Sequence, residues 1–396
     1  MSMSWCWSSS GTMRKRQDEP AAEPPSSVAL VVGSTGIVGT FLVDILTQQD
    51  TSGGPWKVYA LSRRPWSRCR RPPPPSRTYT STSPTPPAVA ETLAPFTDIT
   101  HIFYVALASL ATEELIREAN GAMLCNLLSV VVPNCPGLAH VSLQTGTMHY
   151  LGRLECAAET PALDPPFTED MPRLPVFYYD QEDILFDAVA RRGGGGAVTW
   201  SVHRPNIIFI FSPRSGKNLI CTLCVYAAIC RKEGAALRWP GSRAAWEGFY
   251  TASDADLIAE QHVWAALDPV AKNQAFNCSN GDIYKWKKLW PVLAGRFGLE
   301  WRGYECEEQR FKVSDAMAGK EAVWAEIVAE EGLVPTRLHE VANWWTMDVT
   351  ADQFGLNLEI LDCMNKSKEH GFLGFRNSVK SFNSWIDKLK ACRIVP

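Results

Sequence analysis

Five stretches of the chain have the hydrophobic patterning of buried strands. The first, Val28 to Val32, is an unbroken apolar run, which is typical of a parallel strand covered on both faces. The other four lie at residues 57–61, 99–105, 138–143 and 198–203. Helical patterns separate several of them, for example at residues 113–132. Alternating strands and helices predict an α/β fold, with a Rossmann-type doubly wound parallel sheet.

A glycine-rich turn follows the first run directly. Residues 33–39 place Gly33, Gly36 and Gly39 three positions apart, and apolar residues then recur every four positions through Leu46, which predicts a helix. Glycines at these positions allow a tight turn, close approach of the backbone to a pyrophosphate, and packing of the helix on the strand. The pattern predicts a dinucleotide-binding unit, and the alternative is a purely structural turn.

The next strand-like run ends in Ser62-Arg63-Arg64. NAD enzymes usually place an acidic residue there for the ribose hydroxyls, whereas a pair of guanidinium groups fits a 2′-phosphate. We therefore expect NADPH rather than NADH as the cofactor. The alternative is a solvated basic turn.

The pattern changes after Pro213, where longer helical segments rich in Trp and Leu begin. We expect a flexible leader at residues 1–25, an NADP-binding Rossmann domain at residues 26–213, and a smaller, mostly helical substrate lobe at residues 214–396. Part of the substrate lobe is expected to return to the sheet.

Residues 65–90 do not fit the alternation. Seven prolines lie between Pro72 and Pro87, where a doubly wound fold should place its third strand, and proline cannot sit in a central strand. One interpretation is an irregular surface loop. The other is a reading-frame error, because a shifted frame across Thr80 to Pro86 can encode an acidic strand end. Sequencing the transcript through this segment distinguishes the two.

Composition argues against several classes of protein. The 39 Lys and Arg residues against 42 Asp and Glu residues give a net charge of −3, which disfavours nucleic acid as a partner. With 46% hydrophobic and 20% charged residues, the chain can bury a large core. The apolar run Leu219 to Cys230 is about half of the ~20 residues that span a bilayer, and residues 1–27 show no secretory pattern. We expect a cytoplasmic protein with no membrane partner, and a homodimer is left open.

The 12 cysteines are scattered, as expected of reduced thiols rather than a disulfide framework. Cys221, Cys224 and Cys230 have a spacing that suggests metal, yet they lie in an apolar helical run without a second Cys/His pair. We interpret them as buried thiols and expect no metal site.

Candidate catalytic residues lie in two segments, residues 143–150 and 177–183. Short-chain reductases usually carry a lysine four residues after a tyrosine, but Tyr178 has Glu182 at that position. Tyr284 and Lys288 have the spacing but come late in the chain. His149 and His203 are candidate bases, and the alternative for each is a structural histidine.

Several longer segments of the sequence match a known family. They are Ala60–Arg64, Thr100–Val105, Phe177–Tyr179, Trp200–Pro205, Ser253–Glu260 and Asn365–Arg376. In these segments the chain resembles the plant progesterone 5β-reductase and iridoid synthase family, NADPH-dependent enone 1,4-reductases of the extended short-chain dehydrogenase type. The resemblance runs from about Ser26 to Pro396, except for the proline-rich stretch. It implies NADPH and a small apolar enone substrate, without choosing between steroids and monoterpene-like compounds.

The resemblance also implies roles for individual residues. It places the catalytic tyrosine at Tyr178, whose phenol would donate a hydrogen bond to the enone oxygen as negative charge builds there. It places the family's catalytic lysine at Met148, which supplies neither charge nor N–H, so reduced activity is expected. The cofactor contacts that it implies are Thr35, Gly36, Ile37, Arg63, Arg64, Ala106, Gln144, Ile208 and Ser215, and the glycine pattern adds Gly33.

Two further positions depart from the family, since Asn206 and Ile210 replace glycines. The first hypothesis is therefore an enone reductase, and the second is a catalytically impaired member that binds NADPH or a small apolar ligand. A third, a sugar-nucleotide epimerase or dehydratase, is disfavoured because the Tyr-x-x-x-Lys pair is missing from the expected strand.

Overall fold

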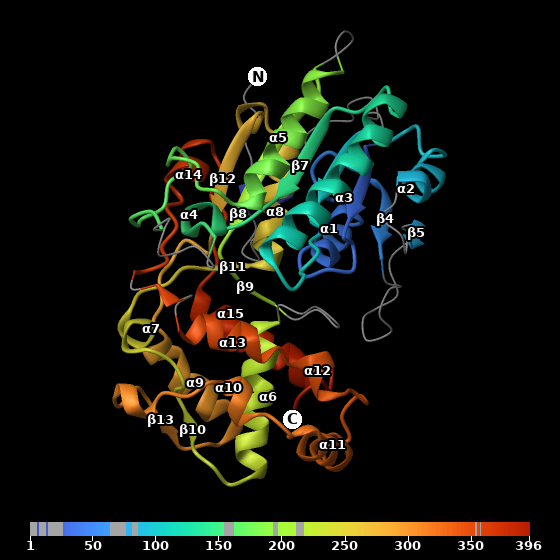
Figure 1. Cartoon of the computed structure of the whole chain (residues 1–396). Helices are drawn as coiled ribbons and strands as arrows, with labels where there is room; N and C mark the ends of the chain where they lie inside the picture. Colours follow the sequence, from blue (N-terminus) through green and yellow to red (C-terminus); the bar gives the residue numbers. More distant parts are fainter. Residues whose placement is uncertain are drawn as a thin grey trace.

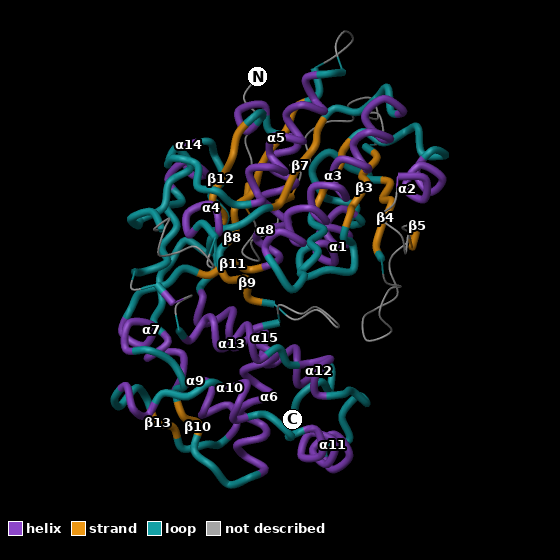
Figure 2. Tube along the Cα trace, in the orientation of Figure 1, coloured by secondary structure: helices purple, strands orange, loops and turns teal. Residues whose placement is uncertain are grey.

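The structure is a computed structural model. It describes residues 6–7, 13–14, 27–63, 77–80, 86–153, 162–192, 197–210, 218–352, 355–356 and 358–396. The strands gather in one body, and a mostly helical body lies below it in Figure 1; Figure 2 shows the same division by secondary structure.

The upper body is built on a seven-stranded parallel sheet with the order β12-β8-β7-β6-β3-β4-β5. Its strands are β3 (Val28–Val32), β4 (Lys57–Ser62), β5 (Arg77–Thr80), β6 (His101–Tyr104), β7 (His140–Gln144), β8 (Thr199–Pro205) and β12 (Gln274–Cys278). From β3 the chain runs outward to β4 and β5, then crosses back to β6 on the other side of β3. The strand order therefore reverses between β3 and β6, and ligands of doubly wound sheets bind at the carboxyl ends of the strands at such a point.

Helices cover both faces of this sheet. On one face lie α1 (Gly39–Leu46) and α8 (Ala255–Leu267), and on the other lie α2 (Pro86–Leu93), α3 (Glu113–Asn134) and α5 (Phe177–Ala190). Alternate residues of β3 face the two layers, with Ala29 and Val31 in one core and Val28, Leu30 and Val32 in the other. Burial on both faces explains why this strand is apolar throughout.

The lower body packs around α6 (Leu219–Lys232), which is buried from Leu219 to Cys230. Its other helices are α7 (Arg243–Glu247), α9 (Trp286–Phe297), α10 (Val313–Ala316), α11 (Glu321–Glu330), α12 (Leu338–Val341), α13 (Trp344–Ala351) and α15 (Ser378–Ala391). The remaining elements are α4 (Met148–Leu151), α14 (Asn365–Glu369), the 3-10 helices η2 (Pro269–Ala271) and η3 (Glu307–Gln309), and three short sheets that pair β1 (Cys6–Trp7) with β2 (Met13–Arg14), β9 (Ile207–Phe209) with β11 (Ala252–Asp254), and β10 (Leu237–Arg238) with β13 (Trp301–Arg302).

The structure describes part of the proline-rich segment, and residues 65–76 and 81–85, where an irregular loop is expected, lie outside the described residues. Within residues 65–90, Arg77–Thr80 forms strand β5, and α2 begins at Pro86. Strand β5 contains no proline and lies at the edge of the sheet, so the prolines on either side do not interrupt a ladder of hydrogen bonds. The third strand of the doubly wound half is therefore present in spite of the prolines. The limits of the leader and of the two lobes stay predictions.

One helix among the described residues is long and apolar enough to cross a membrane. It is α3, rather than the run at residues 219–230. Helix α3 packs against α2 and α5 and buries residues such as Leu124 and Leu128 in the core of the sheet body. Core helices of soluble proteins pass the same test of length and composition, so this is weak evidence for a membrane span.

Candidate active site

The glycine turn after β3 is closed by backbone contacts. The amide of Gly33 donates to the carbonyl of Leu61 at 2.9 Å, and Gly33 has a φ of 91°. A Cβ on Gly33 would lie 2.8 Å from the backbone of Ala106, and one on Gly39 would overlap the Gly33 carbonyl group. Only glycine fits these positions, and the absence of a side chain at Gly39 lets α1 pack on β3 as a dinucleotide unit requires.

Most of the predicted cofactor residues come to the same edge of the sheet. Gly33, Thr35, Gly36 and Ile37 lie in the turn after β3, Ala106 follows β6, and Gln144 ends β7. Arg63 is exposed directly after β4, and Ile208 lies on β9 opposite Ser253 of β11. Arg64 and Ser215 lie outside the described residues.

Three buried polar atoms at this edge have no hydrogen-bond partner among the residues that the structure describes. They are Ser34 Oγ, the Tyr104 hydroxyl and Gln144 Oε1, from the carboxyl ends of β3, β6 and β7. An unpaired buried polar atom costs free energy, and a polar ligand in the crevice would supply the missing partners. The glycine turn and these atoms therefore fit a dinucleotide. Ser34 and Tyr104 were not predicted, although their positions at a strand end could have suggested them.

Tyr178 lies near the amino end of α5 and is buried. A Cβ on Gly146, which follows β7, would stand 3.3 Å from the Tyr178 hydroxyl oxygen. Burial, and then the nearby charge of Glu113, raises the pKa of the Tyr178 phenol, so the hydroxyl is protonated at neutral pH and can donate a hydrogen bond. Met148, the first residue of α4, packs half-buried against the same cluster.

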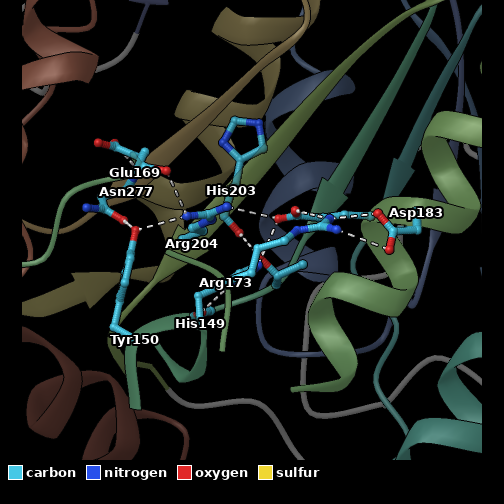
Figure 3. Close-up of polar contacts among 11 residues, drawn as sticks. His149, Tyr150, Glu169, Arg173, Asp183, His203, Arg204 and Asn277 are labelled. Atoms are coloured by element: carbon cyan, nitrogen blue, oxygen red, sulfur yellow. Dashed lines mark hydrogen bonds and ion pairs between the residues drawn. The ribbon is translucent and has the colours of Figure 1, made fainter. Parts of the chain in front are cut away.

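His149 lies in a buried polar network (Figure 3). Its Nδ1 is 2.9 Å from the Gly146 carbonyl oxygen, and its Nε2 is 2.8 Å from Glu182 Oε1. Its ring stacks on Tyr178, with 5.2 Å between ring centroids and 20° between ring planes. Of the two candidate histidines, this one contacts Tyr178.

Two arginines face the same glutamate. Arg204 Nη2 is 3.1 Å from Glu182 Oε1, and Arg173 Nη2 is 3.5 Å from Oε2. Burial pushes the pKa of the Glu182 carboxyl upward, but His149 and Arg204 together outweigh burial, and the net shift is downward. Glu182 is therefore a buried carboxylate held by cationic neighbours.

The model of the PRISE-like Rossmann-fold domain matches residues 29–396. This chain belongs to the PRISE-like Rossmann-fold family. The chain is 53% identical over 399 residues to an (S)-8-oxocitronellyl enol synthase of Nepeta cataria, with 100% of both chains covered. It is 52% identical over 399 residues, again with 100% of both chains covered, to a 3-oxo-Delta(4,5)-steroid 5-beta-reductase of Arabidopsis thaliana. The family resemblance predicted from the sequence is confirmed.

Solved structures share the fold of this PRISE-like chain at low identity. A UDP-glucose 4-epimerase of Thermotoga maritima has a TM-score of 0.61 at 12% identity, over 92% of this chain and 99% of that chain. The terminal R domain of the myxalamid biosynthetic pathway has a TM-score of 0.60 at 13% identity, over 95% of this chain and 93% of that chain. The predicted fold class is confirmed. At such identities the likeness concerns the fold alone, so it does not favour the epimerase hypothesis.

Other candidate residues of this PRISE-like chain lie elsewhere. His203 contacts Gln261 Oε1 at 2.7 Å and Ser201 Oγ at 3.0 Å, and burial lowers the pKa of its imidazole to about 4, as expected of a structural histidine. Tyr284 is buried in an aromatic cluster of the lower body, while Lys288 is exposed, so the pair builds no catalytic site.

The cysteines of α6 lie in the core. The two residues that replace glycines, Asn206 and Ile210, are also buried. Cys221, Cys224 and Cys230 are buried, which confirms the interpretation as buried thiols. Among the residues that the structure describes, no group of His, Cys, Asp and Glu could hold a metal ion. Asn206 Nδ2 donates to Thr251 Oγ1 at 2.7 Å, and Ile210 is fully buried. Asn206 thus ties the end of β8 to the segment before β11.

Proposed function

We propose that this chain catalyses the NADPH-dependent reduction of the carbon–carbon double bond of enones. The observation that carries the proposal is the position of Tyr178. Its protonated phenol lies against Gly146, two residues beyond Gln144 at the edge of the sheet that fits a dinucleotide. Two full-length relatives at 53% and 52% identity, an enol synthase and a steroid 5-beta-reductase, support the same reaction class.

A bound nicotinamide would supply the hydride that adds to the β-carbon of the enone. Negative charge then builds on the carbonyl oxygen, and Tyr178 stabilises it by donating a hydrogen bond from its buried hydroxyl. Because Tyr178 is buried, little water competes for this hydrogen bond, which is therefore stronger than in solution.

The chain's own residues would hold the cofactor. The backbone of the glycine turn, with no Cβ at Gly33 or Gly39, leaves room for the pyrophosphate, and the unpaired Ser34 and Gln144 atoms provide polar partners. Arg63, exposed at the end of β4, would pair with the 2′-phosphate. In an Arg63→Ser variant we expect the Kd for NADPH to rise about tenfold and the Kd for NADH to change little. The exposed Arg191→Ser variant is the control.

The second candidate function is a member that binds NADPH with little or no turnover. Met148 favours it, because this apolar side chain packs at the Tyr178 cluster where the family carries a lysine. Losing one polar group that stabilises the developing charge typically slows a reaction about 10²–10³-fold. We therefore propose a slow reductase as the first candidate.

We propose a small apolar enone as the binding partner. We also propose that the protein is cytoplasmic. The net charge of −3 argues against a nucleic acid partner.

The experiment measures NADPH consumption with progesterone, a small cyclic enone and a monoterpene dialdehyde, beside a direct NADPH titration. Turnover that falls about 10²–10³-fold in Tyr178→Phe, with an unchanged Kd for NADPH, supports the proposal. Tyr179→Phe, on the next residue of α5, is the matched control. NADPH binding without turnover of any enone favours the second candidate, and failure to bind NADPH contradicts both.

A further inference from the structure

Arg204 is a buried arginine one residue before the end of β8, and its side chain contacts three separate segments of the chain. Its Nη2 lies 3.1 Å from Glu182 Oε1 in α5. Its Nη1 lies 3.3 Å from the Tyr150 hydroxyl oxygen in α4 and 3.5 Å from the Glu169 carbonyl oxygen, between the two helices (Figure 3). Both nitrogens donate, because a guanidinium has no acceptor. One planar group therefore links α4 and α5 to the sheet.

The charges of this cluster are balanced between Arg204 and Glu182. Burial lowers the pKa of the Arg204 guanidinium, but Tyr150 and Glu182 outweigh burial and the net shift is upward. The net shift of the Glu182 carboxyl pKa is downward. Burial and the Arg204 charge lower the pKa of the His149 imidazole, against the contacts with Glu182 and Gly146, so this ring is neutral at pH 7.5. Arg204 is thus a buried cation paired with the Glu182 carboxylate.

Glu182 connects this cation to Tyr178 in two ways. It lies four residues after Tyr178 in α5, so the two side chains lie on the same face of the helix. Its Oε1 also lies 2.8 Å from His149 Nε2, and the His149 ring stacks on the Tyr178 ring with 5.2 Å between centroids. A carboxylate can only accept, so the neutral ring donates from Nε2. This bond fixes the orientation of the ring that packs against Tyr178.

Tyr150 connects the same guanidinium to the other side of the candidate site. It lies in α4, which begins two residues after Gly146. Its hydroxyl donates to Asn277 Oδ1 at 2.5 Å, so the hydroxyl oxygen is able to accept from Arg204. The close approach of Gly146 and the Tyr178 hydroxyl depends on how α4 packs on α5, and Arg204 contacts both helices.

We propose that Arg204 is a positioning residue, which holds α4 against α5 and so keeps the Tyr178 hydroxyl next to Gly146. Its role in the reaction rests on the proposed reductase function. The position of Tyr178 does not, so the two are tested separately. Arg117 offers the matched control, because it pairs with Asp180 of α5 at 2.7 Å but lies at the surface. Ion pairs in contact with water contribute little to stability.

The first test is a ¹⁹F NMR spectrum of the full chain, with its 10 tyrosines replaced by 3-fluorotyrosine. The Tyr178 signal is the one missing from Tyr178→Phe. Arg204→Lys keeps the charge but loses the rigid fork of donors, so we expect the Tyr178 signal to shift by more than its linewidth. In Arg117→Gln this signal should keep its native position.

The second test compares kcat in two backgrounds. Arg204→Lys should lower kcat for an enone about tenfold, with an unchanged Kd for NADPH, because Tyr178 is displaced. In Tyr178→Phe the hydroxyl is absent, so adding Arg204→Lys should lower the single-turnover rate less than about twofold. A residue with a purely structural role would lower the rate by the same factor in both backgrounds. Arg117→Gln should stay within about twofold of the native kcat.

An unchanged Tyr178 signal in Arg204→Lys overturns the proposal, as does an equal shift in Arg117→Gln. If Arg204→Lys does not fold, Arg204→Met combined with Glu182→Gln takes its place, since neither partner is then left buried with an unpaired charge. A shifted signal with no loss of kcat, or with an equal loss in both backgrounds, supports the position but overturns the role in the reaction. A shifted signal in a native chain that turns over no enone rejects the proposed function and still supports the position.

Discussion

The hydroxyl oxygen of Tyr178 lies 3.3 Å from the point where a Cβ on residue 146 would stand. The same Cβ would stand 3.3 Å from the Pro205 carbonyl oxygen, so it would be squeezed from two sides. In Gly146→Ala, Tyr178 has to move by a few tenths of an ångström, and we expect kcat for an enone to fall about tenfold because the donor no longer meets the carbonyl oxygen. The Kd for NADPH should stay unchanged. Steady-state kinetics and a cofactor titration measure both.

The control for this substitution is Gly137→Ala. Its Cβ would meet the Thr100 methyl group at 3.8 Å, an ordinary contact, and Gly137 precedes β7 whereas Gly146 follows it. Equal kcat values for Gly146→Ala and the native chain would show that the hydroxyl does not need this close fit.

A substitution at Met148 is expected to raise kcat rather than lower it. A lysine at this position would place an ammonium group in the half-buried cluster that contains Tyr178, where it stabilises negative charge on the enone oxygen. We expect Met148→Lys to raise kcat about 10- to 100-fold over the native chain. Met148→Leu keeps the volume without the charge and should leave kcat near the native value. An equal rise in both variants would point to packing rather than charge.

The third glycine of the turn can be tested through stability. A Cβ on Gly39 would overlap the Gly33 carbonyl group, so Gly39→Ala should lower the free energy of unfolding by about 1–3 kcal/mol or more and abolish NADPH binding. Gly295→Ala, within α9 and with open space around the new Cβ, should instead raise stability by about 0.5–1 kcal/mol. Chemical unfolding measures both, and normal NADPH binding by Gly39→Ala would refute the role given to the turn.

Asp362 predicts a dependence of stability on pH. Burial raises the pKa of its carboxyl from 3.8 to about 7, against the hydrogen bonds of Asn206, Thr147 and Thr251. Between these pH values the folded chain keeps a proton that the unfolded chain has released, so this group's contribution to stability falls as pH rises from about 4 to 7. Asp362→Asn removes that loss, and its stability relative to the native chain should increase over this range by up to about 4 kcal/mol.

Chemical unfolding at pH 5 and pH 8 checks the dependence on pH. Asp187→Asn is the control, since Asp187 is exposed and pairs with Arg191 one turn along the chain. Its effect should vary with pH by less than about 1 kcal/mol. The same pH response in both variants would contradict a raised pKa at Asp362.

The sequence predicted those elements for which one short segment contains all the evidence. Strand β3 and the glycine turn were predicted because burial on both faces and a crowded turn each leave a mark on consecutive residues. Strand β12 has no such mark, since its sequence Gln-Ala-Phe-Asn-Cys mixes polar and apolar positions at the end of the sheet. Strand β5 was hidden by its flanking prolines.

The candidate site shows the same contrast. Tyr178 was expected from the resemblance, but the bond between His149 and Glu182 joins residues 33 positions apart on two helices. No spacing rule within one element brings such residues together, and only the packing of α4 on α5 does so. The unpaired atoms of Ser34 and Tyr104 likewise became visible once three strand ends met at one edge.

Strand β12 completes the sheet although it comes after α6 in the chain. A ribosome must therefore make α6 and α8 before β8 gains its outer partner. A chain cut short before Gln274 would leave the ladder of β8 open, and exposed strand edges of this kind recruit other chains. A fragment that ends before Gln274 is thus unsuited to expression, and a premature stop between α6 and β12 should yield aggregated protein rather than a smaller cofactor-binding domain.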